Sequence, residues 1–395
     1  MGAAAATAPA RDWEAPAWEA PLFDLKAQIT APVKIASVEL LRREKTYFVR
    51  VQSSDGVTGI VKTKEIEDFV PIFLRRVAPF FVGRDARDLE RLMDDLYIQH
   101  YKISGQAFWL PAAQAEHAVW DLLGRTAQKP VAALLGAKTG GIRQRAIPVY
   151  LSGSGREETA EREVEIYVEG MKETGAAGFK LKIGGRMSRN ADAYPGRTEK
   201  MLELARARAG DRAVLYADAN GSYDYTEAVR IGRLMERSKY QFFEEPCPWE
   251  ENSLTKRVAD TLDIPIAAGE CDNSLWRFQW LLENNAAQII QPDLNYCGGI
   301  VRAARVARMA QAVGVPITPH STETGAAGAK MLHFAAAIPN IGPYMEWPYR
   351  GKSKPASWYT PELKICDGQI PLPEGPGFGV EFDPDYWKSA ELLRT

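Results

Sequence analysis

Lysine, acidic and histidine residues recur at the ends of short apolar, β-prone segments between residues 179 and 346. The first of these segments ends in two lysines, Lys180 and Lys182. The later ones end, at intervals of 26, 26, 23, 27 and 26 positions, in Asp218, Glu244, Glu270, Asp293, His320 and Glu346. Each interval fits a strand, a loop and a helix, as in a (β/α)8 barrel, where functional groups lie at the C-terminal ends of strands. The spacing therefore predicts that these side chains surround one barrel mouth.

Three of the carboxylates, Asp218, Glu244 and Glu270, come from three consecutive predicted strands and can meet at one point. Hard oxygen ligands of this kind suit Mg²⁺, which takes few carboxylates and keeps positions for water and substrate oxygens. Each carboxylate could instead cap the helix that follows it, but three at equal spacing favour the metal. The adjacent Glu245 is interpreted as a residue behind the ligands. Asn220 shares a strand face with Asp218 and could assist the metal or the substrate.

The two lysines Lys180 and Lys182 share one face of their strand, because side chains alternate along a strand. Two ammonium groups side by side, next to a divalent cation, are expected to lower each other's pKa. A lysine in this setting can act as a general base near neutral pH. The alternative, a surface pair on an edge strand, conflicts with the barrel, which has no edge strand.

The histidine that ends the seventh segment, His320, follows the segment that ends in Asp293. A carboxylate bound to an imidazole fixes its tautomer and raises its basicity, so the pair is predicted to be a second acid/base. His117 and His333 fall in helical patterns and are interpreted as packing residues. Glu346, at the eighth strand end, could donate a hydrogen bond to a substrate oxygen only if it were protonated. Its alternative is an ion pair with one of the two lysines.

The elements that must position these groups alternate strictly between strand and helix from about residue 146. Hydrophobic patterning predicts eight strands, at 147–151, 178–182, 213–218, 241–244, 264–269, 287–291, 315–318 and 343–346. Helices are predicted at 226–238, at 274–284, and from Gly298-Gly299 to Val313. Eight such units predict a closed parallel barrel. The fold class is therefore α/β, a modified (β/α)8 barrel.

The first part of the chain is patterned differently and predicts an α+β domain that caps the barrel. Alternation between Val33 and Gly56 predicts two antiparallel strands, and a third begins at Thr58. Helices are predicted at 67–80, at 87–97 and at 112–124, the last ending at Gly124 as a C-cap. The predicted organisation is an N-terminal extension (1–32), a capping domain (33–140), the barrel (141–360), and a C-terminal segment (361–395) that returns to the capping domain.

Composition excludes several classes of function. The 395 residues carry a net charge of −2, which argues against a general nucleic-acid or anionic-membrane binder, and no apolar run is long enough to span a bilayer. The four cysteines, Cys247, Cys271, Cys297 and Cys366, contain no CxxC pair and are interpreted as small semi-buried thiols rather than ligands. The alanine-rich start could be the end of an export signal or an added tail, which leaves localisation open between cytoplasm and export.

The strand-end residues resemble those of the enolase superfamily, and within it the mandelate racemase subgroup. That subgroup carries a Lys-x-Lys pair, three metal carboxylates, an Asp–His dyad and a final Glu on successive strands. The matching residues here are Lys180, Lys182, Asp218, Glu244, Glu270, Asp293, His320 and Glu346. The resemblance spans roughly residues 33–385 and implies Mg²⁺, a small-molecule carboxylate substrate, a homo-oligomer, and removal of the proton next to the carboxylate through an enediolate. Lys180, Asn220 and Glu346 would contact the substrate, with Lys182 and His320 on opposite faces of its α carbon.

The expected reaction is dehydration of an acid sugar, an aldonate or aldarate, to a 2-keto-3-deoxy acid. The alternatives are racemisation or epimerisation of a 2-hydroxy acid, cycloisomerisation of an anhydro-sugar acid, and a non-catalytic sugar-acid binder. One departure from relatives is the short connection of residues 41–45 between the first two strands, where a substrate-covering loop is usual. The cover is therefore expected from the 1–32 arm, the 98–110 region or a neighbouring subunit.

Overall fold

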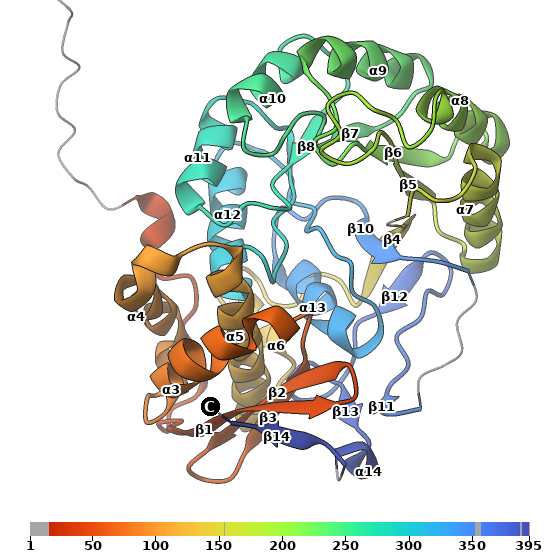
Figure 1. Ribbon diagram of the computed structural model, residues 1–395. Coiled ribbons are helices and arrows are strands. Elements are labelled where there is room, and N and C mark those ends of the chain that lie inside the picture. Colours follow the sequence, from red (N-terminus) through yellow and green to blue (C-terminus); the bar gives the residue numbers. More distant parts are fainter. Residues whose placement is uncertain (1–15, 154, 352–356, 388, 395) are drawn as a thin grey trace, which may run out of the picture.

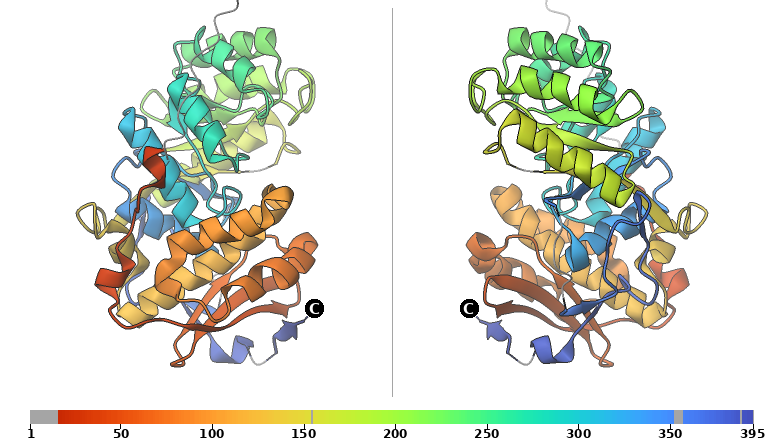
Figure 2. Two further views of the ribbon diagram at one scale, coloured as in Figure 1. Left: turned by 90° about the vertical axis from the view of Figure 1, so that its left-hand side faces the viewer. Right: turned by 90° about the vertical axis from the view of Figure 1, so that its right-hand side faces the viewer.

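The computed structural model describes residues 16–153, 155–351, 357–387 and 389–394. It consists of an α+β part and a helix-ringed barrel that lies against it (Figure 1). Two further views show the capping helices and sheet stacked beneath the barrel (Figure 2). The alanine-rich start considered above lies outside the described residues. Among the helices that are described, none has both the length and the apolar character needed to cross a membrane.

The capping sheet is antiparallel, with the strand order β14-β1-β2-β3. Its strands are β1 (Ile35–Arg43), β2 (Thr46–Ser53), β3 (Thr58–Lys62) and β14 (Glu391–Leu393). The long helix α5 (Gln106–Ala127) packs on β2 and β3. Gly59 permits this contact, because a Cβ atom there would lie 2.3 Å from the Leu122 backbone nitrogen. The two-residue turn between β1 and β2 confirms that no long loop joins these strands.

The capping domain is helical where helices were predicted, but the helix bounds differ, and the helix predicted at 112–124 already begins at Gln106. The 67–80 stretch forms a series of short turns: η2 (Glu67–Phe69), α2 (Val70–Ile72), η3 (Phe73–Val77) and α3 (Ala78–Phe81); α4 (Leu89–His100) follows. The prediction that Gly124 caps its helix is wrong, because α5 continues to Ala127 and Gln128 takes the left-handed conformation at φ 52°. Gly124 instead allows a close approach, since a Cβ atom there would lie 2.6 Å from Gly377 Cα.

The barrel strands pair in parallel with their chain neighbours in the predicted order. They are β4 (Ala146–Ser152), β5 (Gly178–Lys182), β6 (Val214–Asp218), β7 (Phe242–Glu244), β8 (Ile266–Ala268), β9 (Ile289–Ile290) and β10 (Met345–Pro348). The helices around them are α7 (Ala160–Thr174), α8 (Arg197–Ala209), α9 (Tyr225–Arg237), α10 (Asn252–Ala259), α11 (Leu275–Glu283), α12 (Ile300–Ala312) and α13 (Ala329–Ala337). The parallel pairing of β10 with β4 joins the last strand to the first.

The seventh predicted strand, 315–318, is reduced to isolated bridges rather than a regular strand. Ile317 bridges to Ile290 on one side and to Ile341 on the other, so the ring of backbone contacts is still continuous. Pro316 and Pro319 flank this position, and proline has no backbone N–H to donate to a neighbouring strand. The ladder is therefore limited to bonds such as Ile317 N–H to the Asn340 carbonyl, at 2.9 Å.

The segments near both ends of the described chain pack against the barrel or the capping domain. Near the start, Trp18 donates to Gln279 Oε1 at 3.0 Å and meets Trp276 edge to face, so Trp18 lies against α11. Near the end, the Phe378 backbone N–H donates to Asp121 Oδ1 on α5 at 2.8 Å. β12 (Gln369–Pro371) pairs antiparallel with β4, and β14 joins the capping sheet. The C-terminal segment thus connects the barrel to the capping domain.

Candidate active site

The strand-end residues meet at one end of the barrel. Parallel register makes Lys182 the direct neighbour of Asp218, and Asp218 the direct neighbour of Glu244. None of the proposed site residues is more than 8% exposed: Lys180, Lys182, Asp218, Asn220, Glu244, Glu270, Asp293, His320 and Glu346. Such a density of buried charge persists only where charges are paired or hold a cation.

The three carboxylates predicted to bind metal converge as expected. Asp218, Glu244 and Glu270 each place one carboxylate oxygen within 4.8 Å of the others. Glu270 Oε2 is a buried oxygen with no hydrogen-bond partner in the described structure. Burial and the neighbouring carboxylates raise the pKa of Glu244 despite the attraction of Lys180. An all-oxygen site with an unsatisfied acceptor suits Mg²⁺.

Each lysine is held by acidic residues rather than by solvent. Lys180 Nζ lies 2.8 Å from both oxygens of Glu244 and 2.9 Å from Glu346 Oε1, and Lys182 donates to Asp218. The predicted lowering of the lysine pKa values assumed a divalent cation beside the two ammonium groups, and it stays a prediction for the cation-bound site. Burial acts to lower the pKa of Lys182, and Lys180 lowers it further, but the combined attraction of Asp218, Glu270 and Glu244 outweighs both and the pKa is raised. A cation bound to these carboxylates would offset their attraction for the ammonium group and so lower the pKa of Lys182.

The Asp–His pair forms as predicted, with an unexpected third member. His320 Nδ1 lies 2.8 Å from Asp293 Oδ2, and Nε2 lies 3.6 Å from Glu270 Oε2. Lys64, which follows β3 in the capping domain, donates to the same Asp293 oxygen at 3.0 Å. Burial acts to raise the pKa of Asp293, but Lys64 and His320 hold it well below its usual range. Because the carboxylate is ionised, Nδ1 carries the proton and Nε2 is left to face the acidic residues.

Glu346 is an ion-paired carboxylate in this structure. Burial acts to raise its pKa, but Lys180 and His320 outweigh burial and lower it to about 2. Its two oxygens accept hydrogen bonds from Ser152 Oγ at 2.5 Å and from the Ser321 backbone N–H at 3.1 Å. The alternative of an ion pair with Lys180 therefore describes this residue, and protonation would require the loss of that pairing.

The Asn220 amide is fixed on both sides. Arg156, on the loop after β4, donates from Nη2 to Asn220 Oδ1 at 2.9 Å. Asn220 Nδ2 donates to Asp218 Oδ2 at 3.0 Å and to Glu270 Oε1 at 3.3 Å. Because a guanidinium can only donate, Arg156 fixes which end of the amide is the oxygen. Asn220 thus supports the acidic residues through its NH₂ group.

Sequence reasoning missed several residues of the site. Lys64 and Arg156 lie outside the repeating strand ends, and Ser152 is the inconspicuous end of the first barrel strand. Gln291, which donates to Glu244 Oε2 at 3.0 Å, was visible in the Gln-Pro-Asp motif of the sixth strand but was given no role. No local pattern marks Lys64, because its partner Asp293 is 229 positions away.

The capping domain, rather than the arm, borders the mouth. The described part of the arm packs on outer helices rather than at the mouth: Trp18 binds Gln279 of α11, and the backbone N–H groups of Leu22 and Phe23 donate to Glu90 of α4. From the 98–110 region, Gln106 Nε2 donates to the Cys271 carbonyl at 3.0 Å, just beyond β8. A cavity of about 290 Å³ lies beside Lys64, between β2, β3 and the loop after Ile317. Its lining is polar and includes Lys62, Lys64, Glu65, Thr322, Glu323 and Thr324.

Comparison with known proteins places the chain among relatives of the same architecture. Residues 163–386 match the family described as enolase C-terminal domain-like. Residues 17–136 match the mandelate racemase/muconate lactonizing enzyme N-terminal domain. The chain is 28% identical over 337 residues to an arabinonate dehydratase of Saccharolobus solfataricus, covering 83% of this chain and 86% of that protein. It is 27% identical to a D-galactarolactone cycloisomerase of Agrobacterium fabrum, over 91% and 95% of the two chains.

Solved structures agree with this assignment. A protein from Roseobacter denitrificans superposes with a TM-score of 0.85 at 32% identity and covers 91% of this chain and 99% of its own. A mandelate racemase/muconate lactonizing protein from Paracoccus denitrificans, complexed with magnesium, has a TM-score of 0.82 at 26% identity, over 92% and 99% of the chains. The two matched domains together cover most of the described residues. The chain therefore belongs to the mandelate racemase/muconate lactonizing enzyme family of the enolase superfamily.

Proposed function

We propose that this protein removes the proton next to the carboxylate of an acid sugar, an aldonate or aldarate, and dehydrates it to a 2-keto-3-deoxy acid. The observation that carries the proposal is the convergence of two separate acid/base groups on one set of carboxylates. Lys182 donates to Asp218, and His320 Nε2 lies 3.6 Å from Glu270 Oε2. A substrate held at these carboxylates through a cation has one acid/base group near each side.

The cation proposed for this site is Mg²⁺, held by Asp218, Glu244 and Glu270. When bound, it supplies Lewis-acid stabilisation of the negative charge that builds on the substrate carboxylate. A proton next to a carboxylate is too weakly acidic for a side-chain base alone, so stabilisation of this charge is essential. The fit rests on three converging carboxylates and on the unsatisfied Glu270 Oε2.

The chain's own groups supply the remaining steps. Lys180 is proposed to hold one substrate carboxylate oxygen, where its ammonium offsets charge in the enediolate. Lys182 and His320 are proposed to exchange protons at opposite faces of the α carbon. In dehydration, one removes the α proton and the other gives a proton to the departing β-hydroxyl, which leaves as water. Asp293 and Lys64 position His320 and keep its Nε2 directed to the reacting centre.

Two observations favour a polyhydroxylated substrate. The cavity lined by Lys64, the partner of Asp293, has lysine, glutamate and threonine side chains that suit several hydroxyl groups, and none of the proposed metal or acid/base residues lines it. Relatives with similar sequences are named arabinonate dehydratase and, in Saccharopolyspora erythraea, L-rhamnonate dehydratase at 26% identity. Racemisation or epimerisation of a 2-hydroxy acid is the second candidate, because the same pair of acid/base groups can return the proton to the opposite face.

Cycloisomerisation of an anhydro-sugar acid is supported by the relative named D-galactarolactone cycloisomerase. A non-catalytic sugar-acid binder is disfavoured, because each of the lysines, carboxylates and the Asp–His pair is present and buried at the mouth.

The test is a screen of aldonates, aldarates and simple 2-hydroxy acids with Mg²⁺ in D₂O. Formation of 2-keto acid and incorporation of deuterium at C2 are recorded together. Keto acid from one acid sugar is the expected result. Deuterium incorporation with a change of configuration and no keto acid would replace dehydration by epimerisation. An absence of both signals, for acids whose binding is detected by calorimetry, would support the binder.

A further inference from the structure

Glu245 is a buried carboxylate in an unusual setting. It is 4% exposed, and its Oε1 has no hydrogen-bond partner in the described structure. Its backbone has a φ of 39°, in the left-handed region that non-glycine residues seldom occupy. The charges that act most strongly on it are other carboxylates, those of Glu270, Asp218 and Glu244. A buried carboxylate among carboxylates requires a proton or a cation to balance it.

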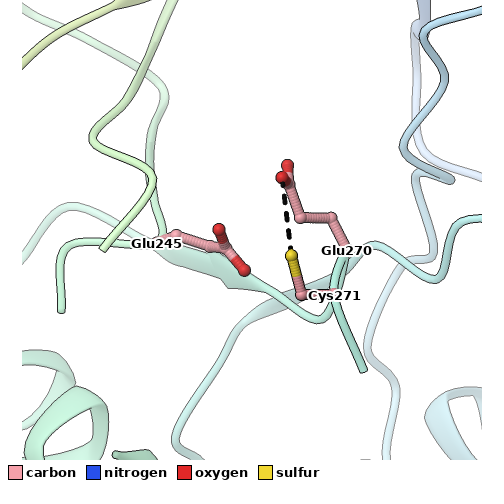
Figure 3. A group of neighbouring side chains, drawn as sticks. All are labelled: Glu245, Glu270 and Cys271. Carbon is pink, nitrogen blue, oxygen red and sulfur yellow. Dashed lines mark hydrogen bonds between the residues drawn. The ribbon is translucent and has the colours of Figure 1, made fainter. Parts of the chain in front are cut away.

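Two neighbouring side chains complete a set of donor atoms around this residue. Glu245, Glu270 and Cys271 each place one oxygen or sulfur atom within 4.8 Å of the other two. Figure 3 shows the Glu245 carboxylate and the Cys271 thiol turned toward one another, with the Glu270 carboxylate above the sulfur. The Cys271 thiol donates to Glu270 Oε1 at 4.0 Å, whereas Glu270 Oε2 faces His320 Nε2 at 3.6 Å. The Glu245 carboxylate, whose Oε1 has no hydrogen-bond partner among the described residues, thus lies close to the thiol.

The positions of the three groups allow one cation to contact all of them. Each group has a donor atom within 4.8 Å of the other two, and Glu245 Oε1 has no hydrogen-bond partner among the described residues. Thiols and carboxylates release their protons when they bind a metal ion.

We propose that Glu245, Glu270 and Cys271 form a second cation site that takes a thiophilic divalent ion such as Zn²⁺, Co²⁺ or Cd²⁺. The sulfur donor sets this site apart from the all-oxygen set of Asp218, Glu244 and Glu270, because Mg²⁺ does not favour thiolates. Glu270 belongs to both sets and would bridge the two ions. The proposal revises the interpretation of Cys271 as a packing thiol and does not depend on which reaction the enzyme performs.

The experiment is a Cd²⁺ titration of the full-length, reduced protein in excess Mg²⁺ and without substrate. Thiolate coordination gives an ultraviolet sulfur-to-cadmium charge-transfer band, which binding at oxygen ligands alone does not produce. We expect a saturable band in the wild-type protein, its loss in Cys271→Ser, and an affinity weakened at least about tenfold in the isosteric Glu245→Gln. Cys366→Ser removes an exposed thiol distant in sequence from the set and is expected to leave the titration unchanged.

Two outcomes would overturn the proposal: a wild-type protein without a thiolate band at saturating Cd²⁺, or a band of full intensity in Cys271→Ser. Circular dichroism and thermal unfolding establish that each variant is folded, and Cys271→Ala provides a second substitution if the serine variant is unstable. Because substrate is absent, the titration can fail while the D₂O screen succeeds, or succeed while that screen fails. The two proposals are thereby tested separately.

Discussion

Lys64 Nζ of the capping domain lies 3.0 Å from Asp293 Oδ2, the same oxygen that accepts from His320 Nδ1 at 2.8 Å. Lys64 is 7% exposed and its ammonium also lies 3.9 Å from the centre of the Tyr296 ring. The pairing raises the pKa of Lys64 against the effect of burial, because Asp293 attracts the charged form. The capping domain therefore contributes directly to the orientation of a proposed acid/base group of the barrel.

Replacing Lys64 by Met should impair both stability and turnover. Removal of one partner leaves a buried carboxylate charge, which costs about 3–5 kcal/mol of unfolding free energy. The turnover number should fall by at least about tenfold, because Asp293 loses a donor that fixes the carboxylate to which His320 is bound. Urea denaturation and steady-state kinetics measure the two effects. Lys64→Arg should restore part of both, and Lys129→Met, which removes an exposed lysine, should change neither. Equal activity in Lys64→Met and wild type would show that Lys64 does not position the dyad.

The two acid/base groups should be separable by the face of the substrate at which they act. Lys182→Ala and His320→Asn should each abolish proton exchange at one face of the α carbon and preserve binding of the acid. Nuclear magnetic resonance of the C2 deuterium in D₂O, with both C2 epimers of a substrate acid, distinguishes the faces. If both variants lost exchange at the same face, the opposed arrangement of the two groups would be wrong.

Arg156 should affect turnover through Asn220. In Arg156→Met the amide oxygen of Asn220 loses its donor, and the amide can rotate away from Asp218 and Glu270. We expect turnover to fall by about tenfold or more with a smaller change in KM, because the cation-binding carboxylates lose an oriented donor. Arg162→Met, which removes an exposed arginine paired only with Glu165 among the ion pairs described, is the matched control. A change confined to KM would instead assign Arg156 to substrate binding.

His333 should make stability depend on pH. Its Nδ1 accepts from the Ala132 backbone N–H at 3.1 Å and its Nε2 donates to the Phe378 carbonyl at 3.0 Å, so only the neutral ring fits. Burial lowers its pKa to about 4, whereas the ordinary value is about 6.5. Between these values the unfolded chain binds a proton that the folded chain does not. The unfolding free energy should therefore fall as pH is lowered through this window, by up to about 3 kcal/mol.

The measurement is urea denaturation of wild type and His333→Gln at several pH values between 7 and 4. Glutamine can accept and donate at similar positions but does not titrate, so the variant should lose part of the pH slope. The buried His117, whose pKa is also lowered by burial, should contribute to the pH dependence of the unfolding free energy that is left in both proteins. Parallel pH profiles would rule out a contribution from His333.

Gly124 should be intolerant of alanine, although helix propensity alone favours the change. A Cβ atom would lie 2.6 Å from Gly377 Cα, a backbone atom that cannot move independently of the C-terminal segment. The predicted effect of Gly124→Ala is a loss of about 1–3 kcal/mol of unfolding free energy. Gly105→Ala, where a Cβ atom would meet no atom within 4 Å, should be close to neutral. Thermal unfolding of both variants provides the comparison, and equal midpoints would disprove the steric explanation.

The sequence by itself determined the parts of this protein that depend on local periodicity. Strand and helix patterns are short-range properties, so the order of the barrel strands and the convergence of Asp218, Glu244 and Glu270 could be predicted from spacing. Asp293 and His320 followed from the same repeat. The sequence predicted a regular seventh strand at 315–318, where the structure has only isolated bridges. The apolar pattern does not show how the two prolines limit hydrogen bonding around Ile317.

The tertiary structure decided what depends on contacts between distant segments. Lys64 reaches Asp293 across 229 positions and from another domain, and no repeat connects them. The charge states of Lys182 and Glu346 in this structure cannot be read from the sequence, because a pKa depends on burial and on the sum of all neighbouring charges. The same reason separates Glu245 from Glu244: adjacent residues at one strand end face different partners, and only their three-dimensional surroundings give each its chemistry.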